Sequence, residues 1–506
     1  MSKIFRAAMT VTIFSVITRA MGFLMKIVLS RNLEPSSLGE YQIAMSVFSV
    51  LLTLIASGLP LIVSRRVSFF ANNNPQMVHK TSSAGLAISL SLSVAFCAVL
   101  FVFKDLLSGL FASEHIGAMV LALTPALIFS SIYSILRGTL WGQKKFFAIS
   151  FAEFFEQLIR IVCLIVLFML PDTHMTGGVK ATFSLSVACI FSGVLVLVMY
   201  FKAGNRLMSP KGQLLSVLKQ SSSITLARTA SSIVTMLISF IIPLRLATFG
   251  FTQSQAMAEF GIVTGMALPL ITIPGTFISS IAVALVPEIS SQTTNIDKNG
   301  AKNLPALKTQ ISVALSAALI ISFMLVPAFF ALGTPIAEIL FKNTRAGTYV
   351  SAGSFLMITM GITQITSSVL NAIGLEIKTL KNYAIGAVAL LLGIYFLPAI
   401  IGAMSLVVSM LAMNLISGLL NLSMLKKRGL IGTNLPKTTL KLVLITAMTT
   451  AITFFSYGLL SKALSMFFAA AISGALSLAV FFLLSYALNI VTVRTFVSKK
   501  LIKKNK

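Results

Sequence analysis

Three basic side chains lie within a short apolar stretch near the start of the chain. Residues 18–31 read TRAMGFLMKIVLSR and include Arg19, Lys26 and Arg31. A cation near the middle of a bilayer costs about 2.5–3.5 kcal/mol. Arg19 and Lys26 are seven residues apart, so on a helix they share one face about 10 Å apart. Arg31 lies near the expected helix end, where its side chain can extend to the interface. We interpret Arg19 as a donor for a desolvated anion. Lys26 is either a second such donor or, like Arg31, a side chain that extends to the interface.

The elements that carry these residues are membrane helices. Hydrophobic residues make up 57% of the chain and charged residues 10%, whereas about a quarter of the residues of soluble domains are charged. Apolar runs of about 20 residues recur, each able to cross roughly 30 Å of hydrocarbon as a helix. We therefore predict an all-α integral membrane protein with about 14 transmembrane helices. The predicted spans are residues 10–29, 40–63, 81–103, 116–136, 146–170, 181–201, 222–246, 256–286, 311–331, 348–373, 383–400, 402–425, 442–460 and 465–491.

Basic residues are unequally distributed over the predicted loops. Most of the 39 Lys and Arg residues fall on one set of alternating loops, which the positive-inside rule places in the cytoplasm. Both termini are then cytoplasmic, including the basic tail 494–506. The net charge of +27 is accounted for by this topology and suits anionic membrane lipids, so we expect no nucleic-acid partner.

The sequence offers no signature of an enzyme or of a cofactor site. There is no long hydrophilic stretch, and the phosphate-loop pattern GxxxxGK[ST] is absent. The three His residues are scattered, while Cys97, Cys163 and Cys189 fall in apolar runs without paired spacing. We expect a non-enzymatic transporter with no cofactor or metal, driven by the membrane potential or by an H⁺ or Na⁺ gradient that the sequence does not identify.

Two pairs of segments indicate an internal repeat. LGEYQIAMSVF, from Leu38, resembles MAEFGIVTGMA, from Met257, and SSIYSILRGTLWGQKK, from Ser130, resembles QITSSVLNAIGLEIK, from Gln364. Transporters are often built from two similar halves with the substrate path between them. The predicted parts are an N-terminal lobe of six helices (1–215), a C-terminal lobe of six helices (216–430), and two added helices with the basic tail (431–506).

Further charges occur inside the predicted spans. Glu156 and Arg160 are spaced at i and i+4, which predicts a structural ion pair within the fifth helix. Glu153 has no such partner and is left to accept a hydrogen bond from another helix or to bind a coupling cation. Arg228 lies in the seventh helix, the counterpart of the first, where the symmetry would bring it opposite Arg19. Its depth of about six residues also permits snorkelling.

The eighth predicted span contains two prolines. Pro269 and Pro274 each remove a backbone donor, which predicts a kink or a break in this helix. Such an interruption suits a gating element, although prolines are also common in membrane helices in general.

Two stretches resemble a known group of exporters. TRAMGFLMKIVLSRNLEPSSLGEYQIAMSVFSVLLTLIASGLPLIVSR and SILRGTLWGQKKFFAISFAEFFEQLIRIV resemble the opening helices and the fourth-to-fifth helix junction of the multidrug/oligosaccharidyl-lipid/polysaccharide exporter superfamily, and within it the stage V sporulation protein B group and the lipid II flippases. The resemblance implies two six-helix lobes in a V, as in multidrug exporters of the superfamily. It also implies a central cavity with alternating access, and two appended helices that form a lipid-facing groove.

The resemblance also implies a substrate and a site. It indicates translocation of an undecaprenyl-pyrophosphate-linked glycan, with lipid II for peptidoglycan as the first candidate. Arg19 matches the SR-x-x-GF pattern of the flippases, Lys26 lies one position from the next family arginine, and Glu40 falls near a family carboxylate. We therefore predict that Arg19, Lys26 and Arg228 bind the pyrophosphate, in a monomer located in the bacterial cytoplasmic membrane.

Other functions remain open at this point. A flippase for O-antigen, teichuronic acid or capsule units would use the same fold and the same pyrophosphate group. A cation-coupled multidrug exporter would need carboxylates facing its cavity, whereas the first helix offers only cations. A membrane scaffold without transport would leave the cations inside the spans unexplained.

Overall fold

The computed structural model describes residues 3–71, 73–171, 175–282, 289–290, 304–431 and 435–490. Within these ranges every regular element is helical and no strand occurs. Helices are expected here because the hydrocarbon core contains no water, so a spanning segment must satisfy its backbone donors and acceptors internally. The predicted all-α membrane architecture is confirmed.

The helices of the first part of the chain correspond to the predicted spans. They are α1 (Lys3–Asn32), α2 (Pro35–Ala56), α3 (Leu59–Phe70), α4 (Pro75–Leu110), α5 (Glu114–Ala122), α6 (Thr124–Gly142), α7 (Phe146–Met169), α8 (Gly177–Lys202), α9 (Leu214–Thr248) and α10 (Gln253–Gly261).

The second part begins with irregular helix and continues with longer helices. Its elements are the π-helix η1 (Ile262–Ala267), α11 (Leu268–Ile271), α13 (Leu304–Phe341), α14 (Thr344–Gly353), α15 (Leu356–Ala372), α16 (Glu376–Phe396), α17 (Pro398–Ile401), α18 (Met404–Lys427), α19 (Leu435–Leu460) and α20 (Met466–Ala487).

The number of spans agrees broadly with the predicted fourteen. In the described residues, twelve helical segments are long and apolar enough to cross a membrane, and α14 with α15, bent by 50°, makes a thirteenth. α7 contains three charged residues, Glu153, Glu156 and Arg160, yet it is otherwise apolar and its 24 residues are long enough to cross. It accounts for the remaining predicted span.

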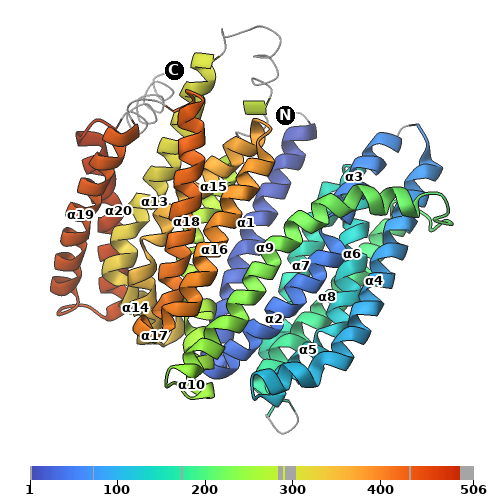
Figure 1. Ribbon diagram of the computed structural model, residues 1–506, viewed down its shortest axis with the longest axis horizontal. Helices are drawn as coiled ribbons and strands as arrows, with labels where there is room; N and C mark the ends of the chain where they lie inside the picture. The colour runs from blue at the N-terminus through green and yellow to red at the C-terminus, as the bar shows by residue number, and fades with distance from the viewer. Residues whose placement is uncertain are drawn as a thin grey trace. The chain divides into compact units, whose positions relative to one another are not determined.

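The chain forms two compact units, Met1–Gly261 and Ile262–Lys506. In the first unit, α7 and α6 both pack on α8, α1 packs on α7, and α2 packs on α9 and α10. Figure 1 shows α6, α7 and α8 side by side in this unit. The predicted boundary at residue 215 rests on the internal repeat and stays a prediction, while the contacts place α9 and α10 with the first unit.

The segment between α8 and α9 is fastened to the first unit. Asn205 is 3% exposed and exchanges two amide hydrogen bonds with Gln143, at 2.7 and 3.1 Å. The backbone N–H of Met208 donates to Ser83 Oγ on α4 at 2.9 Å. These contacts hold the linker against the helix ends of the first unit, which is why α9 begins within that unit.

The second unit is built around α13. This long helix packs on α14, α15, α19 and α20, and α18 packs on both α15 and α16. In Figure 1, α19 and α20 run side by side next to α13. The interior between α15, α16 and α18 contains a satisfied amide network, in which Asn382 donates to Asn421 at 2.9 Å and Asn421 donates to Thr366 at 3.2 Å.

The second predicted span, 40–63, is interrupted in the structure. α2 ends at Ala56 and α3 starts at Leu59, with Ser57 and Gly58 between them. Pro60, in the first turn of α3, has no N–H for a continuous helix, and Gly58 lies against Ser221 and Thr225 of α9, where a Cβ would come within 3.0 Å of two atoms. The break therefore lets α9 approach the backbone of the second span closely.

Candidate functional site

The first helix presents its cations on an accessible surface. α1 packs on α7 through Phe14, whose ring lies 6.0 Å from the rings of both Phe147 and Phe154. Arg19 and Lys26 are both exposed in the isolated chain. In the described residues, Lys26 has no hydrogen bond and no salt bridge. The predicted placement of accessible cations within the first span thus matches the observed helix, whereas their role in binding stays a prediction.

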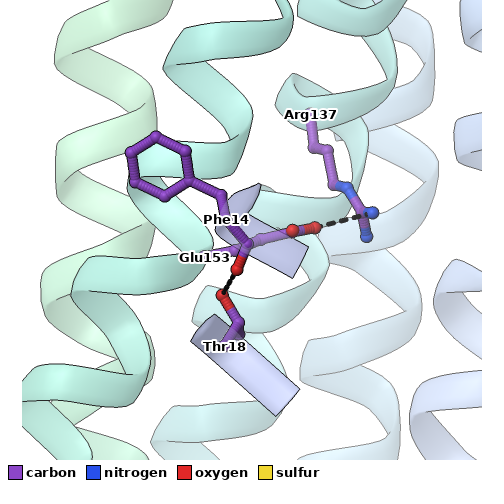
Figure 2. Close-up of polar contacts among 4 residues, drawn as sticks. All are labelled: Phe14, Thr18, Arg137 and Glu153. Atoms are coloured by element: carbon purple, nitrogen blue, oxygen red, sulfur yellow. Dashed lines mark hydrogen bonds and ion pairs between the residues drawn. The ribbon is translucent and has the colours of Figure 1, made fainter. Parts of the chain in front are cut away.

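An ion pair connects α6 and α7 close to α1. Arg137 Nη2 lies 2.7 Å from Glu153 Oε1, and the guanidinium is 5.9 Å from the ring centroid of Trp141. Figure 2 shows this pair together with Phe14 and Thr18, whose hydroxyl donates to the Phe14 carbonyl at 2.7 Å. Glu153 therefore accepts from another helix, which is one of the two roles that the sequence left open, because α6 continues to Gly142 and carries Arg137 beside α7.

The predicted ion pair within α7 is not formed. Glu156 accepts a hydrogen bond from Ser192 Oγ of α8 at 2.8 Å, and Arg160 Nη2 donates to the Tyr41 hydroxyl of α2 at 2.9 Å. No salt bridge joins Glu156 and Arg160 in the described part of the chain. The i,i+4 spacing permits such a pair, but neighbouring helices supply polar partners that turn the two side chains in different directions.

Arg228 has a backbone partner in the first unit. Its Nη1 donates to the carbonyl oxygen of Ser57 at 3.2 Å, in the break between α2 and α3. Ending α2 leaves carbonyl groups without helical donors, and a guanidinium suits them. Thr53 and Ser232 add a hydroxyl contact at 3.0 Å between α2 and α9. Arg228 therefore helps to hold α9 on the broken second span, and its predicted role opposite Arg19 stays a prediction.

Glu40 lies beside a close helix crossing. Its side chain is 9% exposed and accepts a hydrogen bond from Ser113 Oγ at 2.6 Å. α2 and α10 cross at Gly39 and Gly261, where an added Cβ on either residue would lie under 3.0 Å from backbone atoms of the other helix. The segments around Glu40 and Glu259 that suggested the repeat are thus neighbours in space.

The eighth predicted span, 256–286, is irregular where its prolines lie. Its described part consists of α10, η1 and α11, followed after Thr272 by a helix over Ile273–Ala282, and residues 283–286 lie outside the described residues. Pro269 lies in the first turn of α11 and Pro274 in the first turn of the next helix. A π-helix is rare and often marks a functional position. The predicted interruption is present, and the proposed gating role is untested.

Metal and thiol chemistry receive no support from the described residues. No group of three or more His, Cys, Asp or Glu side chains in them could hold a metal ion. Cys97, Cys163 and Cys189 are free.

Several partners of the predicted charges were not apparent in the sequence. Each of these partners contacts one predicted site residue from another part of the fold: Arg137, Tyr41 and Ser192 from other helices, and Ser113 from the connection between α4 and α5. Arg137 is the one with a sequence signal, because it follows an apolar run directly and precedes the only Trp of the chain. The hydroxyl-bearing residues resemble many others in these spans, so nothing in their spacing identifies them.

The helices and the charged groups inside them define a multi-pass membrane protein. The chain belongs to the polysaccharide biosynthesis protein family, whose sequence profile matches residues 4–293, more than half of its length. The resemblance to the multidrug/oligosaccharidyl-lipid/polysaccharide exporter superfamily is thereby confirmed.

Known proteins agree with this membership. Stage V sporulation protein B of Bacillus subtilis (strain 168) is 24% identical over 387 residues, covering 73% of each chain. Lipid II flippase MurJ of the same organism is 22% identical over 364 residues, covering 65% of this chain and 63% of that protein.

Solved structures show the same fold. The inward closed conformation of lipid II flippase MurJ has a TM-score of 0.74 at 15% identity, covering 95% of this chain and 98% of that chain. An inward-facing multidrug resistance MATE family transporter of the superfamily has a TM-score of 0.64 at 16% identity, covering 83% and 98%.

Proposed function

We propose that this protein is a flippase that moves an undecaprenyl-pyrophosphate-linked glycan from the inner to the outer leaflet by alternating access, with lipid II as its substrate. Family membership supports a lipid-linked saccharide, and MurJ among the relatives favours lipid II. The proposal needs no catalytic residue and no cofactor, and it describes a monomeric transporter.

The observation that carries the proposal is the pair of accessible cations in α1. Arg19 and Lys26 are exposed on a membrane-spanning helix, where cations are costly unless they serve a purpose. A pyrophosphate has at least two negative charges, and moving it through a desolvated path requires Arg or Lys donors. The same cations would repel the organic cations that multidrug exporters carry.

Two carboxylates that the sequence analysis considered as coupling or supporting groups argue in the same direction. Glu153 is in a salt bridge with Arg137, and Glu40 is buried and bonded to Ser113. A site for organic cations would need accessible carboxylates without such partners. We therefore rank the multidrug alternative below the glycan flippase.

The driving force and the orientation form part of the proposal. The distribution of Lys and Arg supports cytoplasmic termini in a bacterial inner membrane. Moving one negative charge outward through an inside-negative potential of 100 mV releases about 2.3 kcal/mol, so an anionic headgroup can be exported without ATP. H⁺ and Na⁺ are the candidate coupling ions if a further source of energy is required.

The test is rescue of a bacterium depleted of its own lipid II flippase. We expect wild type to restore growth and Arg19→Ala to fail at equal membrane levels. Val16→Ala, an exposed position of the same helix, is the matched control and is expected to rescue. If well-expressed wild type does not rescue, the substrate is another undecaprenyl-linked glycan, and surface polysaccharide becomes the next assay. Full rescue by Arg19→Ala would remove the anionic path.

A further inference from the structure

Three hydrogen-bond donors in the first unit come from three helices. Arg160 of α7 donates through Nη2 to the Tyr41 hydroxyl of α2 at 2.9 Å. Lys26 of α1 lies close enough to Arg160 for the two positive charges to interact. The packing of α1 on α7 through Phe14 and Phe154 brings these helices together.

The donors of this group exceed its acceptors. Arg160 Nε is buried and has no hydrogen-bond partner. The Tyr41 hydroxyl accepts from Arg160, so its own proton remains available to donate, and its side chain is 4% exposed. The Lys26 ammonium has no acceptor in the described ranges. The Lys26 side chain is exposed, so Arg160 Nε is the buried donor without a partner, and such donors are costly and uncommon in native structures.

The nearest carboxylate on α7 does not neutralise the group. Glu156 lies one turn from Arg160, and its charge interacts with that of Arg160. Its Oε2, however, accepts from Ser192 on α8, and it forms no salt bridge with Arg160 in the described residues. Two interacting cations and a phenol hydroxyl therefore share this region, and the carboxylate that follows them on α7 is bonded to another helix. Two like charges in a medium of low dielectric repel strongly, and an anion between them would relieve that repulsion.

We propose that Lys26, Arg160 and Tyr41 form an oxyanion site for a phosphate group of a lipid-linked diphosphate. The inference rests on the proposed function and adds Arg160 and Tyr41 to the residues that contact substrate. Arg160 donates a hydrogen bond to the phosphate through Nε while its Nη2 stays bonded to the Tyr41 hydroxyl. Tyr41 donates a hydrogen bond to the phosphate through its O–H group. Lys26 contributes its ammonium group. Guanidinium donors arranged in a fixed fork match phosphate oxygens well, and the ammonium acts as a point charge.

The shared chemistry is a phosphate oxyanion, which a diphosphate lipid, inorganic pyrophosphate or an anionic phospholipid could supply. Purified full-length protein in detergent is titrated with farnesyl diphosphate, with inorganic pyrophosphate and with phosphatidylglycerol in separate experiments. We expect binding of farnesyl diphosphate that inorganic pyrophosphate displaces only weakly and phosphatidylglycerol does not displace. Equal displacement by phosphatidylglycerol would overturn the assignment to a diphosphate.

Variants separate the site from a general charge effect. Arg160→Gln should weaken farnesyl diphosphate binding at least tenfold, and Tyr41→Phe about threefold. Arg160→Lys keeps the charge but loses Nε, so its affinity should lie between those of wild type and Arg160→Gln. Arg137→Gln removes a neighbouring arginine that already has a carboxylate partner, so it is the matched control and should bind like wild type. Gel filtration and melting temperature verify that each variant is folded.

The results also separate this inference from the proposed function. Unchanged binding by folded Arg160→Gln and Tyr41→Phe would overturn the oxyanion site, even if wild type rescues the flippase-depleted strain. Loss of binding in these variants, with no rescue by wild type, would support the site while rejecting lipid II as the substrate. If Arg160→Gln does not fold, Tyr41→Phe and Arg160→Lys decide the question, since both keep the size and the charge pattern of the site.

Discussion

At the scale of single residues, polar partners come from other helices. The spacing of Glu156 and Arg160 predicts a local pair, yet their partners are Ser192 and Tyr41, the latter 119 residues away from Arg160 along the chain. The sequence indicates which charges lie within the spans, because an isolated cation or carboxylate stands out in an apolar run. It does not indicate their contacts, since helix packing determines which hydroxyl or carboxylate each one meets.

Double-mutant cycles distinguish the salt bridge that the structure shows from the local ion pair that the spacing predicts. We expect Arg137→Gln and Glu153→Gln to be coupled by about 0.5–1 kcal/mol, because the two side chains form a partly exposed salt bridge. Glu156→Gln and Arg160→Gln should show a coupling below about 0.5 kcal/mol, as expected for residues without a direct contact. Thermal unfolding in detergent supplies the free energies. A larger coupling for the second pair would restore the local ion pair that the spacing predicts.

At the scale of elements, run length and apolar composition were enough to predict the spans. The interruptions were predicted less well. Pro269 and Pro274 indicated the irregular helix around η1. The break between α2 and α3 was not predicted, because Gly58 and Pro60 lie within a run that is otherwise long and apolar enough for one continuous span. Close crossings are also difficult to predict, because a glycine needed for contact and a glycine facing open space look alike in a sequence. Gly39 lies against the backbone of Met257, whereas Gly22 has no heavy atom within 4 Å of an added Cβ.

Substitution of these two glycines should have opposite effects. Gly39→Leu places side-chain atoms where the Met257 backbone lies, so it should destabilise the protein by about 1–3 kcal/mol or more, as overpacking does. Gly22 has no heavy atom within 4 Å of an added Cβ. Gly22→Ala should therefore be neutral or stabilising by up to about 1 kcal/mol, from helix propensity. Melting temperatures in one detergent compare the two, and equal stability would mean that α2 and α10 do not cross closely.

At the scale of the whole molecule, contacts and internal repetition divide the chain differently. The repeat predicts a boundary at residue 215, after six helices. The contacts divide the chain between Gly261 and Ile262, where α10 continues into η1. Both divisions can hold, because the repeat predicts that α9 and α10 open the second half, whereas their contacts with α2 place them in the first unit. A repeat is sought in the sequence alone, but the packing of α9 and α10 on α2 depends on side-chain shape.

The orientation in the membrane is the prediction at this scale. α19 and α20 are joined by the short connection 461–465, so Lys427, before α19, must lie on the same side as the chain that follows α20. The positive-inside rule places that side in the cytoplasm, because Lys426, Lys427 and Arg428 lie there, whereas Lys462 stands alone in the opposite connection. Lys427 and Lys462 are both exposed.

Accessibility labelling tests this orientation. In a background with all three native cysteines replaced by serine, Lys462→Cys should react with a membrane-impermeant maleimide in intact cells. Lys427→Cys should react only after the cells are permeabilised. The reverse pattern would place the termini outside. The membrane potential would assist outward movement of the anionic headgroup in either orientation, because it acts on the charge of the substrate, so this result would change the topology and leave the proposed driving force intact.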